Sequence, residues 1–231
     1  MNLAVEEGRF VSLVGPSGSG KSSLLRAIIG LQAPLWGTVD TGLPRAQISI
    51  LFQDDALLPW KTARHNVALG LALNGMERAR ALTEADSWLD RLGLAGFGDR
   101  FPRHLSGGQR KRVALAQVLA MRPRLILMDE PFASLDAIVR ARIVQDVVAL
   151  VECEKISVLL VTHDLEEALS LSDEVYLLSR GPRARITQSY KVPIPRPRDP
   201  VHSRTHPAFV PLYERLWADL SREVDYRAEA A

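Results

Sequence analysis

The sequence predicts an α/β protein with a mainly parallel, buried sheet. Short apolar runs of strand length alternate with stretches of helical spacing, which is the pattern of parallel strands joined by helical crossovers. The runs are continuously apolar, as in strands that are covered on both faces. A glycine-rich loop follows the first run and precedes a helical stretch. The expected strands cover residues 10–14, 47–52, 125–128, 158–161 and 174–178.

Two further regions depart from this alternation. Between residues 54 and 104 the strand pattern stops, and helical spacing takes over at 67–73 and again at 82–92. This predicts a helical insertion between two strands of the sheet. From residue 207 onward, apolar residues near helical spacing predict a short C-terminal amphipathic helix. These apolar residues are Val210, Leu212, Leu216 and Leu220.

Composition limits the classes of function. Apolar residues make up 47% and charged residues 24% of the 231 residues, which favours a folded globular protein over a disordered or fibrous one. The 29 basic and 27 acidic side chains nearly cancel, so net charge gives no support to a nucleic-acid-binding role. A single cysteine, Cys153, excludes an internal disulfide and suits a reducing compartment.

Neither membrane insertion nor secretion is indicated. The longest apolar runs, such as 125–128 and 158–161, are far too short to cross a bilayer. Residues 1–9 contain Glu6 and Glu7 and lack the basic-then-apolar order of a signal peptide. We therefore expect any association with a membrane to go through a partner.

A basic, proline-rich segment lies late in the chain. Residues 180–204 contain seven basic residues and one acidic residue, Asp199, interleaved with five prolines. We expect a solvated, semi-extended segment, with contact to anionic lipid head groups or an acidic partner as the alternative.

Residues 15–22, Gly-Pro-Ser-Gly-Ser-Gly-Lys-Ser, match the pattern of a phosphate-binding loop. The loop stands where the chemistry needs it, between the strand 10–14 and the helical run 23–29. Its backbone N–H groups and the positive end of the helix bind phosphates, Lys21 meets the β and γ oxygens of the nucleotide, and Ser22 ligates Mg²⁺. The expected nucleotide-binding residues are Gly15, Pro16, Ser17, Gly18, Ser19, Gly20, Lys21, Ser22 and Ser23.

Two carboxylates end the apolar run 125–128. A buried strand that ends in Asp129 and Glu130 can deliver acid groups to the edge of a nucleotide site. Without other motifs, an Asp-Glu pair in this position is interpreted as two solvated charges at the end of a strand. With the phosphate loop present, we expect Asp129 to hold Mg²⁺ and Glu130 to polarise the attacking water.

The pentapeptide 105–109, Leu-Ser-Gly-Gly-Gln, resembles the signature sequence of ATP-binding cassette (ABC) ATPases. Its serine and glycines open the helix expected over 109–121, so hydroxyl and N–H groups at a positive helix end could accept a phosphate. The resemblance implies that this segment accepts the γ-phosphate of ATP bound to a second subunit. The residues concerned are Ser106, Gly107, Gly108 and Gln109.

The rest of the family pattern follows in order and extends the resemblance over residues 8–180. It implies that Gln53 contacts Mg²⁺ and the attacking water and links them to the helical insertion. It also implies that Asp136, in the sequence 134–136, shapes the dimer contact. His163, in 162–164, is implied to bond the γ-phosphate. Each of these residues is weak evidence alone.

The resemblance also implies how the chain is divided. A P-loop NTPase core is expected over 1–53 and 105–180, a helical subdomain that docks a permease over 54–104, and a C-terminal tail over 181–231. A small antiparallel β layer is expected beside the adenine base of the nucleotide, and this layer is expected to be incomplete at its N-terminal end. The family places an aromatic residue upstream of the loop to stack on adenine. Phe10 is the only aromatic residue before the loop in this sequence, and we expect its side chain to lie in the core.

A finer resemblance concerns the segment 52–60 and the tail 195–200, which look like the nitrate, sulfonate and taurine importer branch. It implies the ATP-hydrolysing, Mg²⁺-dependent subunit of an importer of a small anionic solute. The implied partners are a second copy of the chain, an integral membrane permease and, indirectly, a substrate-binding protein, with no nucleic acid. The implied location is peripheral, on the cytoplasmic face of the inner membrane.

Two alternatives remain open. One is a soluble ABC ATPase that is not coupled to transport, although the paired cassettes, zinc motifs and coiled coils usual in such proteins are missing from this sequence. The other is a non-catalytic structural subunit, which the presence of Lys21, Asp129, Glu130 and His163 disfavours.

Overall fold

One six-stranded sheet forms the centre of the molecule in the computed structural model, which describes residues 2–225. Its strands lie in the order β2 (Ile48–Leu51), β3 (Leu125–Asp129), β4 (Ser157–Val161), β1 (Phe10–Val14), β5 (Glu174–Leu178) and β6 (Ile186–Lys191). All neighbours are parallel except β5 and β6. Parallel strands end at a common edge, so the segments that follow β1, β3 and β4 meet there. The expected mainly parallel α/β fold is confirmed.

The five strands expected from apolar runs all form, and two of them keep their expected bounds. β6 was missed. It pairs antiparallel with β5 at the edge of the sheet, and of its six residues only Tyr190 is buried. A strand with so little buried surface has no apolar run for sequence reasoning to find. Residues 186–191 nevertheless extend the central sheet.

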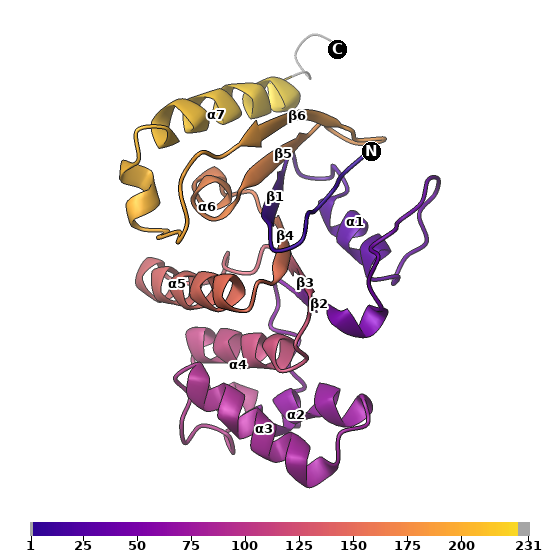
Figure 1. The fold of residues 1–231 in the computed structure, drawn as a ribbon, viewed down its shortest axis with the longest axis vertical. Coiled ribbons are helices and arrows are strands. Elements are labelled where there is room, and N and C mark those ends of the chain that lie inside the picture. Colours follow the sequence, from indigo (N-terminus) through magenta and orange to yellow (C-terminus); the bar gives the residue numbers. More distant parts are fainter. Residues whose placement is uncertain (1, 226–231) are drawn as a thin grey trace.

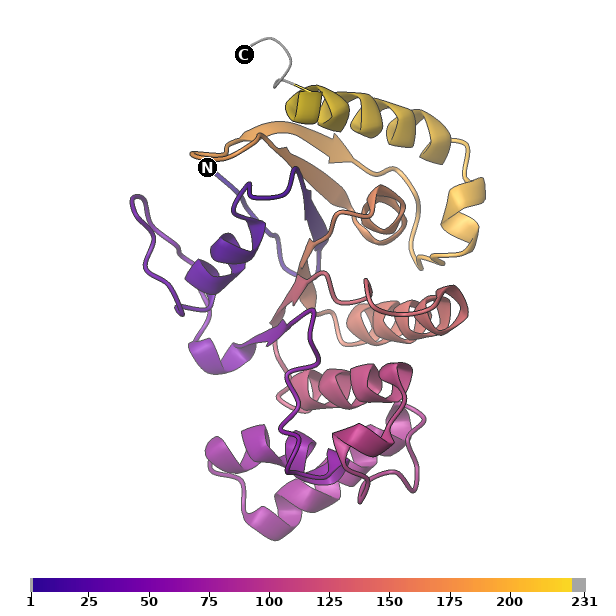
Figure 2. The ribbon, with the colours of Figure 1, turned by 180° about the vertical axis from the view of Figure 1, so that it is seen from behind.

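Helices cover both faces of the sheet (Figures 1 and 2). Along β3 the side chains alternate between faces: Leu125 and Leu127 pack with the helix α1 (Lys21–Ile28), while Ile126 and Met128 face the opposite cluster. That second face is covered by α4 (Gly107–Leu119) and α5 (Ala137–Cys153), and further along the sheet by α6 (Leu165–Leu171). Burial on both sides explains the continuous apolar runs.

The expected helical insertion forms between β2 and α4. It contains α2 (Ala63–Leu73), which begins after the capping residue Thr62, and α3 (Arg78–Arg91). A short 3₁₀ turn, Pro102–His104, then leads into α4. α2 and α3 pack on each other and on α4 at one end of the molecule (Figure 1).

The expected small antiparallel layer is not present as a separate layer in residues 2–225. Residues 31–44 run without strand structure, and the N-terminal residues 2–9 also form no strand. Residues of both segments line one cavity of about 350 Å³. An antiparallel ladder needs a partner strand in register, and within residues 2–225 the antiparallel pair is β5 with β6.

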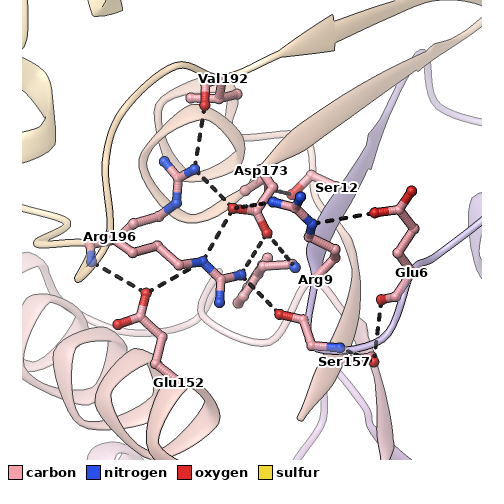
Figure 3. A network of polar contacts seen from close by, with 12 residues as sticks. Glu6, Arg9, Ser12, Glu152, Ser157, Asp173, Val192 and Arg196 are labelled. Atoms are coloured by element: carbon pink, nitrogen blue, oxygen red, sulfur yellow. Dashed lines mark hydrogen bonds and ion pairs between the residues drawn. The ribbon is translucent and has the colours of Figure 1, made fainter. Parts of the chain in front are cut away.

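The basic segment 180–204 is less solvated than expected, because part of it is anchored to the core. Asp173, at the start of β5, binds Arg196 at 2.6 Å and Arg198 at 3.1 Å, and Arg196 also lies 3.8 Å from Glu152 of α5 (Figure 3). Only 2% of the Arg198 side chain is exposed. An arginine can be buried here because its planar guanidinium group donates hydrogen bonds in more than one direction to a carboxylate.

The expected C-terminal helix is α7 (Phe209–Asp225). Leu212, Leu216 and Leu220 pack into the cluster with α6, and Tyr190 of β6 hydrogen-bonds to Asp219. Val210 does not join this cluster, because it lies on the outer face and is 56% exposed, while Phe209 takes the buried position. None of the helices in the described range is both long and apolar enough to span a bilayer.

Candidate active site

The phosphate-binding loop connects β1 to α1 at the carboxyl edge of the sheet. The N-cap of α1 is Gly20 at φ 90°, a left-handed conformation that suits glycine, and no side chain caps the helix. The first N–H groups of α1 are therefore left for an anion. Lys21 is 8% exposed, and its Nζ donates to the carbonyls of Gly15 at 2.7 Å and Pro16 at 2.9 Å. The amine is held within the curve of the loop.

Ser22 and Asp129 come together at this edge from α1 and β3. Ser22 Oγ donates to Asp129 Oδ1 at 3.0 Å, so a hydroxyl and a carboxylate oxygen lie side by side next to the phosphate loop. Hydroxyl, carboxylate and phosphate oxygens are the ligands that Mg²⁺ prefers. The residues present therefore fit the Mg²⁺ site expected for a nucleotide-binding loop of this kind.

Glu130 and His163 form a second pair beside the first. Glu130 Oε2 lies 3.0 Å from His163 Nδ1, joining the segment after β3 to the segment after β4. Glu130 has φ 45°, a conformation that costs a non-glycine residue free energy and is often kept at functional sites. Burial lowers the pKa of Lys21, and the nearby charges of Glu130 and Asp129 oppose that shift. The lysine and both carboxylates thus share one electrostatic environment.

Gln53 lies after β2 and is exposed. Its backbone carbonyl accepts a hydrogen bond from Lys111 Nζ at 3.0 Å, and the same amine pairs with Asp55 at 2.9 Å. The Lys111 side chain is only 1% exposed and comes from α4. The segment that carries Gln53 is therefore fastened to the helix that begins at the signature sequence.

The signature segment opens α4 by a capping box. Ser106 Oγ accepts from the N–H of Gln109 at 3.3 Å, and Gln109 Oε1 accepts from the N–H of Ser106 at 2.9 Å. The helix begins at Gly107, two residues earlier than expected, because this reciprocal cap completes the first turn. A Cβ on Gly108 would come within 2.5 Å of Val139 Cγ1, so glycine allows α4 to approach α5 closely.

The structure brings only some of the expected residues together. The phosphate loop, Asp129, Glu130 and His163 share one edge of the sheet, with Gln53 after the outer strand β2. Ser106 and Gly107 are exposed at the start of α4, and both views show α4 packed with α2 and α3 away from α1 (Figures 1 and 2). Asp136 is exposed as the N-cap of α5, where its carboxylate accepts from the N–H of Val139 at 3.0 Å.

Sequence reasoning missed Lys111 and Arg140, whose side chains contact segments of this site. For Lys111 a signal was available, because it stands four residues before Leu115 and seven before Val118, on the buried stripe of α4. A buried lysine at such a position needs a carboxylate partner. Phe10 behaves as expected: it is 3% exposed within β1 and so belongs to the core.

Comparison with known proteins is consistent with this geometry. The sequence profile of a family described as ABC transporter matches residues 1–133. Nitrate import ATP-binding protein NrtD of Synechocystis sp. is 40% identical over 212 residues, covering 89% of this chain and 79% of the relative. Aliphatic sulfonates import ATP-binding protein SsuB 2 of Rhizobium johnstonii is 42% identical, covering 95% and 85%.

Other relatives are longer. Nitrate import ATP-binding protein NrtC of Synechococcus elongatus is 38% identical over 223 residues, and the chain spans only 34% of its length. Among solved structures, a dimeric bacterial ABC transporter cassette is similar with a TM-score of 0.72 and 34% identity, covering 83% of this chain and 88% of that one. A related dimer, described as a post-hydrolysis state bound to ADP and phosphate, has a TM-score of 0.71 and 33% identity. The chain belongs to the ABC transporter family.

Proposed function

We propose that this chain hydrolyses ATP as the energy-coupling subunit of an importer for a small anionic solute. One observation carries the hydrolytic part: the phosphate loop, the Ser22–Asp129 pair and the Glu130–His163 pair meet at one edge of the sheet, at contacts of 3.0 Å within each pair. These contacts support a phosphate-binding loop, a metal site and a general base that lie next to one another.

Each residue then has a defined task. Lys21 exchanges its loop carbonyls for the β and γ oxygens of ATP, while the N–H groups of the loop and of the first turn of α1 bind the phosphates. Glu130 accepts a hydrogen bond from the attacking water and orients it. His163, which now contacts Glu130, lies where it can donate to the γ-phosphate. Gln53 approaches the same water from the end of β2.

Ser22, Asp129 and Gln53 are the residues that would hold Mg²⁺. When bound, the ion neutralises charge on the phosphate oxygens of the nucleotide. The chain's own contribution is the placement of the hydroxyl of Ser22 against the carboxylate of Asp129, which fixes both oxygens before the nucleotide arrives.

The active unit in this proposal is a homodimer. Ser106, Gly107, Gly108 and Gln109 face the γ-phosphate of ATP held by the other copy, and Asp136 lies at the contact between the copies. The exposure of Ser106, Gly107 and Asp136 supports this arrangement, as do the dimeric cassettes among the similar structures.

The transport part of the proposal draws on the relatives. Two relatives that are similar over most of their length carry names that specify import of nitrate or of aliphatic sulfonates. We propose the division expected from the sequence: a core over 1–53 and 105–180, a permease-docking subdomain over 54–104, and a tail over 181–231. The exposed Trp60 and Leu73 give the subdomain apolar surface for such a contact. The chain would then lie peripherally on the cytoplasmic face of the inner membrane, with a substrate-binding protein acting indirectly through the permease.

Two experiments test the proposal in turn. Purified chain should hydrolyse ATP in the presence of Mg²⁺, and absence of turnover above a Lys21→Ala control would reject the catalytic assignment. Vesicles containing the cognate permease, to be identified by co-purification with this chain, should import nitrate or a sulfonate only when the chain and ATP are supplied. Hydrolysis that no permease stimulates would favour the alternative, a soluble ABC ATPase that is not coupled to transport.

A further inference from the structure

Arg140 lies between two segments of the candidate site that are distant in sequence. It occupies the first turn of α5, directly after the dimer-contact segment 134–136. Its Nη2 donates to the carbonyl of Leu135 at 3.2 Å, and its Nη1 lies 3.5 Å from Asp164 Oδ2, next to His163. One guanidinium group therefore touches both the dimer-contact segment and the turn that carries His163.

That turn is itself tightly specified. Asp164 caps α6, accepting from the N–H of Glu167 at 3.0 Å, and its own N–H donates to Thr162 Oγ1 at 3.0 Å. A small cavity of about 50 Å³ between these groups is lined by Arg140, Glu130 and His163 among others. A displacement of Asp164 would carry His163 with it, since the two residues are adjacent in the turn.

Stability alone does not account for this arrangement. Arg140 Nε is buried and has no hydrogen-bond partner among residues 2–225, and leaving a buried donor unpaired is costly. On its other side the side chain borders a larger cavity of about 270 Å³, so it is not tightly enclosed by packing. Burial raises the pKa of Glu167 to about 7, and a hydrogen bond from Thr162 and the charge of Arg140 oppose this rise. Arg140 therefore acts on Glu167 as well as on Asp164.

We propose that Arg140 is a positioning residue that couples the dimer-contact segment 134–136 to His163. When a second copy contacts residues 134–136, the guanidinium group transmits the change through Asp164 to His163, which then turns from Glu130 toward the γ-phosphate. This inference rests on the proposed function, because it requires that residues 134–136 contact another chain.

Steady-state kinetics give the first test. Arg140→Ala should lower kcat roughly 10- to 100-fold, because a small displacement of a catalytic group has effects of that size. KM for ATP should stay within about twofold, since the phosphate loop is untouched. Arg140→Lys should restore only part of kcat, because lysine lacks the fork needed for both contacts. Arg142→Ala is the matched control: it removes an exposed arginine from the same helix and should leave kcat unchanged.

A double-mutant cycle separates positioning from a merely structural role. If Arg140 acts through His163, adding Arg140→Ala to His163→Ala should cost little further activity, so the two effects would not multiply. Losses that multiply fully would overturn the proposal. So would a fall in kcat that is accounted for by the fraction of unfolded protein in thermal melts of the same samples.

A second readout avoids turnover altogether. In a Glu130→Gln background, which is expected to hold ATP without hydrolysing it, Arg140→Ala should raise the ATP concentration needed for dimer formation about tenfold, measured by light scattering. An unchanged requirement together with unchanged kcat would overturn the inference. If the Glu130→Gln chain does not dimerise with ATP at all, the proposed function has failed first, and the two failures are thereby distinguished.

Discussion

The phosphate loop and the signature segment both lie at the start of a helix, where the proposed function has each of them bind phosphate, but they differ in how complete they are. Within one chain the loop already has its lysine folded onto Gly15 and Pro16 and its serine on Asp129. The signature segment has only its own cap, in which Ser106 and Gln109 satisfy each other, and its first residues are exposed.

This difference indicates which groups of the candidate site lie on the loop side and which lie on the signature side. The loop side carries the lysine, the carboxylates and the histidine, so it can bind a nucleotide and hold a water molecule on its own. The signature side offers a helix N-terminus and a hydroxyl but no base and no metal ligand. In the proposed mechanism, one chain is enough to bind ATP, whereas hydrolysis requires two chains.

Glu130→Gln should produce the largest effect. Removing the base should reduce ATP hydrolysis by about 10²- to 10⁴-fold, because that is the usual contribution of a positioned general base. ATP binding should survive, since Lys21 and the loop are unchanged. Phosphate release and equilibrium binding of a fluorescent ATP analogue would be measured on the same protein. Turnover at the wild-type rate would remove Glu130 from this role.

Ser106→Arg should abolish most hydrolysis by acting on the other half of the site. We expect a loss on the order of 10²-fold, comparable to removing one donor that stabilises the transition state. ATP affinity of the isolated chain should change less than about twofold. Ser87→Arg, at an exposed position of α3, is the matched control and should leave ATP hydrolysis and ATP affinity unchanged. An equal loss of ATP affinity would mean that the signature contacts nucleotide within its own chain.

The sequence predicted most of the loop side and little of what holds the site together. Strand ends are marked by apolar runs, so the edge that collects Lys21 and Asp129 followed from the residues themselves, whereas His163 was identified only through the family resemblance. The contacts of Lys111 and Arg140 could not be predicted in this way. Lys111 pairs with Asp55, 56 residues away, and Arg140 pairs with Asp164, 24 residues away, and no local pattern connects either pair. The sequence pattern did not predict β6 either, because an edge strand with one buried residue lacks an apolar run.

Lys111→Met should have a smaller effect on turnover and a clear effect on stability. The change leaves Asp55 partly buried without its closest cation and frees the Gln53 segment from α4. Because Arg110 still faces Asp55, we expect a loss of about 1–3 kcal/mol of unfolding free energy, the range for a buried polar group that loses its hydrogen-bond partner. Urea titration would measure this, with Arg110→Met as the control, because Arg110 is 41% exposed and lies 3.4 Å from the same carboxylate. Equal losses for the two variants would contradict a special role for the buried lysine.

The smallest expected effect is a pH dependence of stability. Glu167 has its pKa raised by burial from 4.5 to about 7, so between these values the folded chain keeps a proton that the unfolded chain has released. Stability from this group is therefore full below about pH 4.5, falls as pH rises toward 7, and then levels off. Glu167→Gln should flatten this part of the curve, measured by chemical denaturation across the range. Glu166→Gln, which alters a carboxylate paired with Arg204, should leave the slope intact.

The division of the site between two chains is tested most directly by the mass of the Glu130→Gln protein with and without ATP. Light scattering after size exclusion should give a monomer without nucleotide and a dimer at saturating ATP and Mg²⁺. The added Ser106→Arg change should return the protein to a monomer that still binds ATP. A Glu130→Gln chain that stays monomeric while saturated with ATP, or a dimer that Ser106→Arg leaves unchanged, would contradict the account.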